Sequence, residues 1–308
     1  MEWRNIILRI SVVVTTYNGK MHLEKQLLSL LQQERAPDEV LIFDDGSTDG
    51  TIELVQSFIR KNCLESWQFY VNAKRKGWKQ NFMEGLRKAA GDILFPCDQD
   101  DIWYPKKLAE MTAVMEQHPE IKLLACDYRV LYEPGALKAT VYKKTPAETQ
   151  GLITRYGFTK HFFMNPYPGC TYAVRRDFFD AVKELWFDGS PHDEFLWLMA
   201  AVQDGAWFYN RVLMDYVRYS DNASGVRYKD VALQKENLRY IHKQLCALQS
   251  FAAEHPDAVP VERCKMLAAA QIWCAKRQKL METRSPLRWL ALAPWWGYYN
   301  SPRNCLSD

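Results

Sequence analysis

The 308 residues are enough to bury a large hydrophobic core, in one large domain or two smaller ones. A hydrophobic fraction of 48% with 25% charged residues excludes a chain that is disordered throughout. The net charge of +3 is too small to favour nucleic acid as a partner. The eight cysteines show no Cys-x-x-Cys spacing, which argues against a structural zinc site or a redox motif.

The sequence gives no signal for export or for membrane insertion. Its apolar stretches stay below the ~18 uninterrupted residues that a transmembrane helix needs. Residues 1–9 are too short and too charged for a signal peptide. We therefore expect a cytoplasmic protein.

The first hundred residues alternate short apolar runs with segments of helical periodicity. The pattern predicts strands at 10–16, 40–43, 67–71 and 91–96, and helices at 20–33, 52–59 and 78–90. This order is typical of an α/β fold, in which helices cover both faces of a mostly parallel, Rossmann-like sheet.

Polar clusters follow three of these strands, at residues 15–18, 44–49 and 98–101. In such sheets the ligand lies beyond the carboxyl ends of the strands. One cluster alone is explained by turn chemistry, because Asp, Asn, Gly and Ser favour turns for local reasons. Three clusters on one edge favour a nucleotide site.

The third cluster holds three carboxylates within four residues: Asp98, Asp100 and Asp101. Oxygen ligands of this kind suit Mg²⁺ or Mn²⁺, which in turn bind phosphate oxygens. The alternative is a solvated acidic turn before the helix that Pro105 begins. The sequence has neither a Gly-x-Gly-x-x-Gly after the first strand nor a P-loop, so a cation on carboxylates is the expected means of neutralising phosphate.

The second half of the catalytic region is less regular. Residues 128–165 are weakly patterned and are expected to include a long loop over the site. A strand at 169–174, helices at 176–185 and 195–202, and two strands at 207–209 and 212–219 are predicted after it. Asp193 precedes the second of these helices, and one interpretation is that it serves as the helix N-cap.

Helices are also predicted from about residue 226. They are followed by an aromatic, apolar tail at 285–299 that contains Arg288 and is flanked by Arg284 and Arg303. Such a tail can lie in a membrane interface, at the inner face of the cell membrane. Alternatively, it packs back on the catalytic domain or on a second subunit of a homodimer. Pro294 breaks its helical pattern.

The residues at the strand ends resemble the motifs of family 2 glycosyltransferases, which have the GT-A fold. The matching segments are 14–19, 43–49, Asn81-Phe82 with Gly91-Asp92, and 98–103. The form Asp-Gln-Asp-Asp-Ile-Trp resembles the branch that includes bacterial rhamnosyltransferases of surface polysaccharide synthesis. The resemblance is strong over residues 10–110, moderate over 169–225 and absent after that. It implies a catalytic domain at 1–225, with a nucleotide-sugar half at 1–127 and an acceptor half at 128–225, followed by a helical extension at 226–308.

The resemblance also implies roles for single residues. Thr15, Tyr17 and Asn18 would line the base and ribose of the donor, and Asp45 would accept a hydrogen bond from a pyrimidine N3–H. Asp98 would lie near the ribose and, with Asp100, form the Asp-x-Asp metal motif. Asp193 matches the general base, which would take the proton of an acceptor hydroxyl and so invert the anomeric centre. Further donor contacts are expected from Asn81, Gln99 and Arg218, and acceptor or sugar contacts from Asp101, Trp103, His192 and Tyr219.

One departure concerns the segment before Asn222-Ala223-Ser224-Gly225. Relatives often carry a histidine there that approaches the metal or diphosphate, whereas this chain has Tyr219. Tyrosine is a poor ligand for Mg²⁺, so fewer protein groups are expected to hold the metal. Arg218 is displaced by one position and is expected to reach the phosphates.

The sequence thus favours an inverting, metal-dependent transferase that uses a dTDP- or UDP-sugar and a glycan or lipid-linked acceptor. L-Rhamnose from dTDP-rhamnose is the first choice and a UDP-hexose (glucose, galactose or GlcNAc) the second. A non-catalytic carbohydrate-binding protein on the same fold is the alternative from another class. A nucleotidyltransferase would usually show a Gly-rich loop with Arg and Lys after the first strand, which residues 15–18 do not provide.

Overall fold

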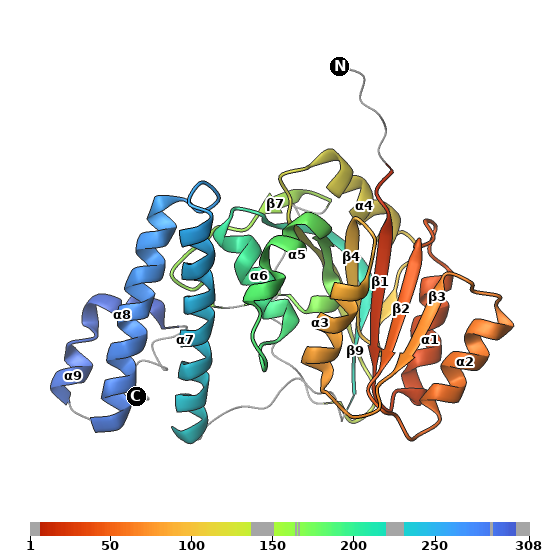
Figure 1. Cartoon of the computed structure of the whole chain (residues 1–308), viewed down its shortest axis with the longest axis horizontal. Helices are drawn as coiled ribbons and strands as arrows, with labels where there is room; N and C mark the ends of the chain where they lie inside the picture. Colours follow the sequence, from red (N-terminus) through yellow and green to blue (C-terminus); the bar gives the residue numbers. More distant parts are fainter. Residues whose placement is uncertain are drawn as a thin grey trace, which may run out of the picture.

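The fold is built on one mixed sheet. The computed structural model describes residues 7–136, 151–163, 165, 167–219, 231–283 and 286–299. The sheet has the strand order β3-β2-β1-β4-β8-β6-β9-β5, and β7 pairs with β9 (Figure 1). Its strands are β1 (Ile10–Thr16), β2 (Glu39–Asp44), β3 (Trp67–Val71), β4 (Ile93–Cys97), β5 (Ile102–Trp103), β6 (Leu123–Tyr132), β7 (Ile153–Arg155), β8 (Tyr172–Arg175) and β9 (Ala206–Arg218).

The first four strands are parallel, as their order of alternating strands and helices predicts. Their apolar residues are buried because helices pack on the sheet. In Figure 1, α3 crosses in front of β1 and β4, whereas α1 lies behind β2 and β3. The helices of this region are α1 (Lys20–Leu31), α2 (Thr51–Lys61), α3 (Trp78–Lys88), α4 (Lys107–Gln117), α5 (Arg176–Val182) and α6 (His192–Val202).

The structure differs from the sequence prediction around β6 and β9. Part of the expected loop at 128–165 is the end of a ten-residue strand, β6, and residues 137–150, 164 and 166 lie outside the described part. The two strands expected at 207–209 and 212–219 are one thirteen-residue strand, β9. The pairing of β6 with β9 shifts register at Asp127, so Asn210 and Arg211, between the two predicted strands, form a bulge within β9.

The pairing register brings the carboxyl ends of three strands to one edge. Thr16 of β1 pairs with Asp44 of β2, and Val14 pairs with Cys97 of β4. The polar residues that follow these strands therefore meet along one rim, as the sequence predicts for a parallel sheet.

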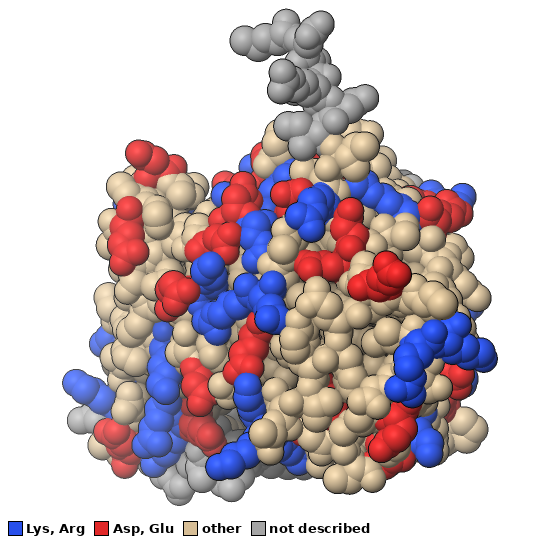
Figure 2. Space-filling model, turned by 45° about the vertical axis from the view of Figure 1, so that its right-hand side comes forward, with Lys and Arg blue, Asp and Glu red and all other residues tan. Residues whose placement is uncertain are grey.

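Helices α7 (Val231–Glu254) and α8 (Val261–Thr283) form a hairpin beside the sheet and are followed by α9 (Pro286–Leu290) (Figure 1). Among the described residues, no helix combines the length and hydropathy needed to cross a bilayer. Arg284, Arg303 and residues 220–225 lie outside the described part. On the face drawn in Figure 2, basic and acidic side chains are interspersed, in keeping with the net charge of +3.

At Gly85, α3 lies close against the sheet, which gives a test of the fold. A Cβ at this position would lie 2.4 Å from Val13 Cγ1 and 3.1 Å from the Phe43 ring. Overpacking of this kind costs about 1–3 kcal/mol, against a helix-propensity gain of about 1 kcal/mol. We expect Gly85→Ala to lower the free energy of unfolding, measured by urea denaturation. Gly157→Ala is the control, because a Cβ there meets no atom within 4 Å. Equal stability of the two variants would contradict the described packing.

Candidate active site

Gln99 ties the end of β1 to the segment after β4. Its Oε1 accepts hydrogen bonds from Thr16 Oγ1 and from the Tyr17 backbone N–H, both at 2.9 Å. Its Nε2 donates to the Tyr17 carbonyl oxygen at 3.3 Å. Thr15 is 7% exposed at the end of β1. The predicted donor contact Gln99 thus has a structural role in holding the β1 terminus.

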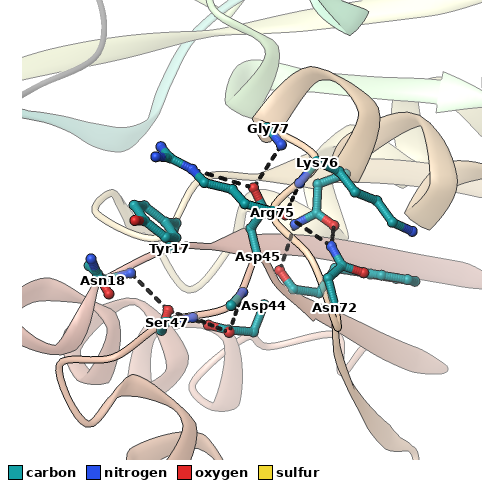
Figure 3. A network of polar contacts seen from close by, with 12 residues as sticks. Tyr17, Asn18, Asp44, Asp45, Ser47, Asn72, Arg75, Lys76 and Gly77 are labelled. Carbon is teal, nitrogen blue, oxygen red and sulfur yellow. Dashed lines mark hydrogen bonds and ion pairs between the residues drawn. The ribbon is translucent and has the colours of Figure 1, made fainter.

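Asn18 links the β1 terminus to the loop after β2. Its backbone is left-handed, with φ at 46°, a conformation that asparagine tolerates better than most residues. The Asn18 N–H donates to Ser47 Oγ at 2.8 Å, and Asn18 Oδ1 accepts from the Thr48 N–H at 2.9 Å. Asp44 closes the same loop by accepting from the Ser47 N–H at 2.8 Å (Figure 3).

Asp45 holds the loop that leads into α3. Its carboxylate accepts hydrogen bonds from the N–H groups of Lys76 at 2.7 Å and Gly77 at 2.8 Å. Asn72 Nδ2 adds a third bond at 3.1 Å (Figure 3). A carboxylate has about four acceptor sites, so these three bonds leave room for one more donor.

Arg75 and Asn81 flank Asp45 in different ways. The Arg75 guanidinium lies 3.9 Å from the centre of the Tyr17 ring, with its side chain 65% exposed. Asn81 is 1% exposed, and it joins Asn72 to the Phe43 carbonyl oxygen. Asn81 therefore stabilises the loop before α3 from its buried side, whereas the Tyr17 ring and the Arg75 guanidinium stack at the rim.

The three predicted carboxylates lie together beyond β4. Burial, and then the charges of Asp100 and Asp193, raise the pKa of Asp98 to about 7. Burial also raises the pKa of Asp100, whose Oδ2 accepts a hydrogen bond from the Tyr219 hydroxyl at 2.8 Å. Burial and both neighbouring carboxylates raise the pKa of Asp101 well above its usual range.

This cluster fits a divalent cation by its own chemistry. Asp101 is 1% exposed, and its Oδ1 accepts from the Val217 N–H at 3.3 Å. Its Oδ2 is buried, and no donor among the described residues lies within hydrogen-bonding geometry of this oxygen. One ligand atom each of Asp98, Asp101 and Cys170 lie within 4.8 Å of one another. Carboxylates crowded in a buried site repel each other, and a cation or a proton relieves that repulsion.

Cys170 and His22 are neighbours of the cluster that the sequence interpretation missed. Cys170 lies just before β8, fully buried, and burial raises the pKa of its thiol well above the usual range. His22 lies in the first turn of α1 and stacks on Tyr219, with ring centroids 4.4 Å apart. The proximity of His22 could not be read from a sequence in which 197 positions separate it from Tyr219.

Arg218 and Trp103, from which contacts with the donor and the acceptor or sugar were expected, are both buried. Arg218 is 5% exposed, with its guanidinium 5.8 Å from the centre of the Tyr216 ring, and its charge opposes the rise in the pKa of Asp100. Trp103 is 2% exposed and packs against the Lys107 ammonium at 3.9 Å. Trp103 therefore lies in the core beneath the rim, and its contact with acceptor or sugar stays a prediction.

Asp193 lies in the first turn of α6 and is not its N-cap. The helix begins at His192 after Pro191, so the N-cap interpretation is wrong. Asp193 Oδ1 accepts from the Glu194 N–H at 2.9 Å, and burial raises the pKa of the Asp193 carboxyl. His192 is 3% exposed and stacks on Phe82 at 4.0 Å, and burial lowers its pKa to about 3, so the imidazole is neutral.

The known proteins that resemble this chain in sequence include glycosyltransferases. The family described as Glycosyl transferase family 2 matches residues 11–179. The dTDP-rhamnosyl transferase RfbG of Shigella flexneri is 24% identical over 228 residues, which cover 69% of this chain and 73% of that protein. The poly(ribitol-phosphate) beta-N-acetylglucosaminyltransferase TarS of Staphylococcus aureus is 30% identical over 155 residues, 50% of this chain and 26% of that protein.

Solved structures share the fold. S. aureus TarS in complex with UDP-GlcNAc superimposes with a TM-score of 0.61 at 18% identity, over 94% of this chain and 88% of that chain. A mannosyltransferase from Pyrobaculum calidifontis, in complex with GDP-Man and Mn²⁺, has a TM-score of 0.52 at 17% identity, over 98% and 79% of the two chains. The predicted GT-A fold is confirmed.

The raised pKa of Asp98 predicts how stability depends on pH. Between pH 4, near the ordinary pKa of an Asp carboxyl, and pH 7, Asp98 keeps its proton in the folded state and has lost it in the unfolded state. The contribution of Asp98 to the free energy of unfolding therefore falls as pH rises through this range. Asp98→Asn removes this group, and its stability relative to wild type should rise by about 2 kcal/mol between pH 5 and pH 7.

Chemical denaturation of both proteins at the two pH values measures this difference. Mn²⁺ should stabilise the wild type more at pH 7 than at pH 5, because the cation replaces the proton on the carboxylates. A stability difference that does not change with pH would contradict the described burial of Asp98.

Proposed function

The chain belongs to glycosyl transferase family 2, and from this premise we propose an inverting transfer of a sugar from a nucleotide diphosphate to an acceptor hydroxyl, with Asp193 as the general base. One observation carries the proposal. Asp193 on α6 lies beside Gly169, where an added Cβ would be 3.0 Å from the Asp193 Cβ, and the thiol of the next residue, Cys170, lies within 4.8 Å of a carboxylate oxygen of Asp98. The Asp193 charge accordingly raises the pKa of Asp98. An acid–base group and a phosphate-side acidic cluster thus border the same site, although 95 residues separate them along the chain.

The environment of Asp193 suits a base. Its Oδ1 accepts a hydrogen bond from the Glu194 N–H at 2.9 Å, and the Gly169 backbone adds a further hydrogen bond to the carboxylate. Because a carboxylate has about four acceptor sites, capacity remains for a substrate hydroxyl. Burial raises the pKa of Asp193 and so makes its carboxylate a stronger proton acceptor. In the proposed step Asp193 takes the hydroxyl proton while the acceptor oxygen bonds to the anomeric carbon. The bond from that carbon to the diphosphate breaks, and its electron pair leaves with the nucleoside diphosphate.

The donor would lie along the rim from Tyr17 to the acidic cluster. Asp45 has acceptor capacity for a pyrimidine N3–H, and the Tyr17 ring offers a stacking plane near the Asn18 turn. Asp98 and Asp100 would hold a divalent cation, Mn²⁺ or Mg²⁺, which when bound neutralises the charge of the leaving diphosphate. The Tyr219 hydroxyl orients Asp100 from the position where relatives place a histidine.

L-Rhamnose from dTDP-rhamnose remains the first choice of donor, supported by the name of the Shigella relative. A UDP-hexose is the alternative, supported by the name and bound ligand of TarS. We propose a glycan or lipid-linked acceptor in surface polysaccharide synthesis, and a cytoplasmic enzyme. Leu287 and Leu290 of α9 are 78% and 58% exposed, which supports peripheral membrane contact of the tail. A homodimer is the other proposed use of that surface.

Removal of the base tests the assignment of Asp193. We expect Asp193→Asn to lower kcat by roughly 10²–10⁴-fold, the usual contribution of general-base catalysis, with an unchanged Kd for the donor. Initial rates and donor titration by calorimetry measure the two quantities. Asp180→Asn, on the exposed side of α5, is the matched control and should retain wild-type activity. Full turnover of Asp193→Asn would refute the assignment.

A donor panel distinguishes the sugars and the functional classes. We expect release of nucleoside diphosphate from dTDP-rhamnose with Mn²⁺, and at least tenfold less after chelation of the metal. Preference for a UDP-hexose would select the alternative donor. Absence of hydrolysis and of binding for every UDP- and dTDP-sugar would favour the non-catalytic carbohydrate-binding alternative.

A further inference from the structure

A polar cluster joins α6 to α7, outside the rim already described. The Tyr240 hydroxyl of α7 donates a hydrogen bond to Glu194 Oε2 at 2.8 Å. Gln244, one turn later on α7, donates to the Tyr240 hydroxyl, and Ser190 Oγ lies 3.2 Å from the same oxygen. Ser190 is fully buried and Gln244 is 4% exposed, so these bonds form in the interface between the helices.

The cluster is built around Glu194. Burial, and then the charge of Asp193, raise the pKa of Glu194 to about 7. A half-buried carboxyl of this kind is costly unless it is hydrogen-bonded, and two side chains of α7 supply the bonds. The centre of the Phe187 ring lies 5.8 Å from the centre of the Tyr240 ring, so Phe187 packs beside the cluster. These two partners of Glu194 come from 46 and 50 positions downstream in the sequence.

Glu194 is directly coupled to Asp193. Both lie in the first turn of α6, where the helix dipole favours carboxylates. The backbone N–H of Glu194 is the group that donates to Asp193 Oδ1 at 2.9 Å. A shift of the Glu194 backbone would therefore change one of the hydrogen bonds that orient the Asp193 carboxylate, to which the Gly169 backbone also contributes.

We propose that α7 positions the general base: Tyr240 and Gln244 hold Glu194, and Glu194 fixes the N–H that orients Asp193. This inference rests on the proposed role of Asp193. It gives the helices after residue 230 a function in the reaction, and it makes Tyr240 a positioning residue.

The charged groups around Glu194 determine the expected pH response. Asp193 neighbours it on α6, and Lys79 of α3, which donates to the Gly189 carbonyl oxygen, lowers the pKa of both carboxyls. His192 is neutral. Without the Tyr240 hydroxyl, Glu194 keeps its proton to a higher pH. A neutral Glu194 then destabilises the Asp193 carboxylate less, so the acidic limb of the kcat/KM profile moves to lower pH.

The test uses the full chain with Tyr240→Phe, which removes the hydroxyl and keeps the ring. Because a small misplacement of a catalytic group can cost up to 10²-fold, we expect kcat to fall roughly tenfold or more, with the acidic limb shifted and the Kd for nucleoside diphosphate unchanged. Arg239→Ala, an exposed neighbour on α7, is the matched control and should behave as wild type. An unchanged kcat and pH profile in Tyr240→Phe, or an equal loss in Arg239→Ala, would overturn the proposal.

Glu194→Gln distinguishes the effect of the Glu194 side-chain position from the effect of its charge. Its amide oxygen still accepts the Tyr240 hydrogen bond, so kcat should stay within about threefold of wild type while the acidic limb moves to lower pH. A loss as large as that of Tyr240→Phe would overturn the positioning role. Gln244→Met repeats the test if Tyr240→Phe does not fold, as judged by circular dichroism. Loss of activity in Asp193→Asn together with wild-type behaviour of Tyr240→Phe would reject this inference alone, whereas full activity of Asp193→Asn would reject the proposed function.

Discussion

The rest of the site depends on the burial of carboxylates at the carboxyl end of β4. Asp98, Asp100 and Asp101 lie within four residues, and burial raises the pKa of each. Like charges in a poorly hydrated site destabilise one another, and only a proton, a cation or a hydrogen-bond donor offsets this cost. The chain supplies hydrogen-bond donors to these carboxylates, which include the Tyr219 hydroxyl and the Val217 N–H at the end of β9 and the Cys170 thiol. The carboxylates are thus prepared for a ligand of opposite charge.

The sheet brings the other residues of the site next to these carboxylates. Parallel pairing of β1 with β2 and β4 aligns three strand ends, and Gln99 and Asn18 then link the loops by hydrogen bonds. Along this edge the strand order places Tyr17, after β1, between Asp45, after β2, and the acidic cluster, after β4. On the other side, α6 brings Asp193 near Asp98, and α7 braces the start of α6. A single rim therefore combines groups suited to base, diphosphate and acceptor.

Much of this arrangement could be predicted from the sequence, because its signals are local. Apolar runs and their polar ends indicated the parallel strands, and the order of strands and helices placed Asp45 and Asp98 on one edge. The length of β9 was mispredicted, because Asn210 and Arg211 interrupt its apolar pattern, and the sequence does not show that they are extra residues in a bulge of one continuous strand. Cys170, His22 and Tyr240 escaped prediction, since each acts through contacts between distant segments that leave no periodic pattern in the sequence.

The most direct test of the account is the position of a bound cation. Crystals grown with Mn²⁺ and a uridine or thymidine diphosphate would locate the metal by its anomalous scattering. The account predicts a peak within coordination distance of the Asp100 carboxylate, at the rim beside Asp98 and with the diphosphate oxygens on its other side. A nucleotide bound along the rim with no metal at Asp98 or Asp100, or a metal bound elsewhere on the chain, would contradict it.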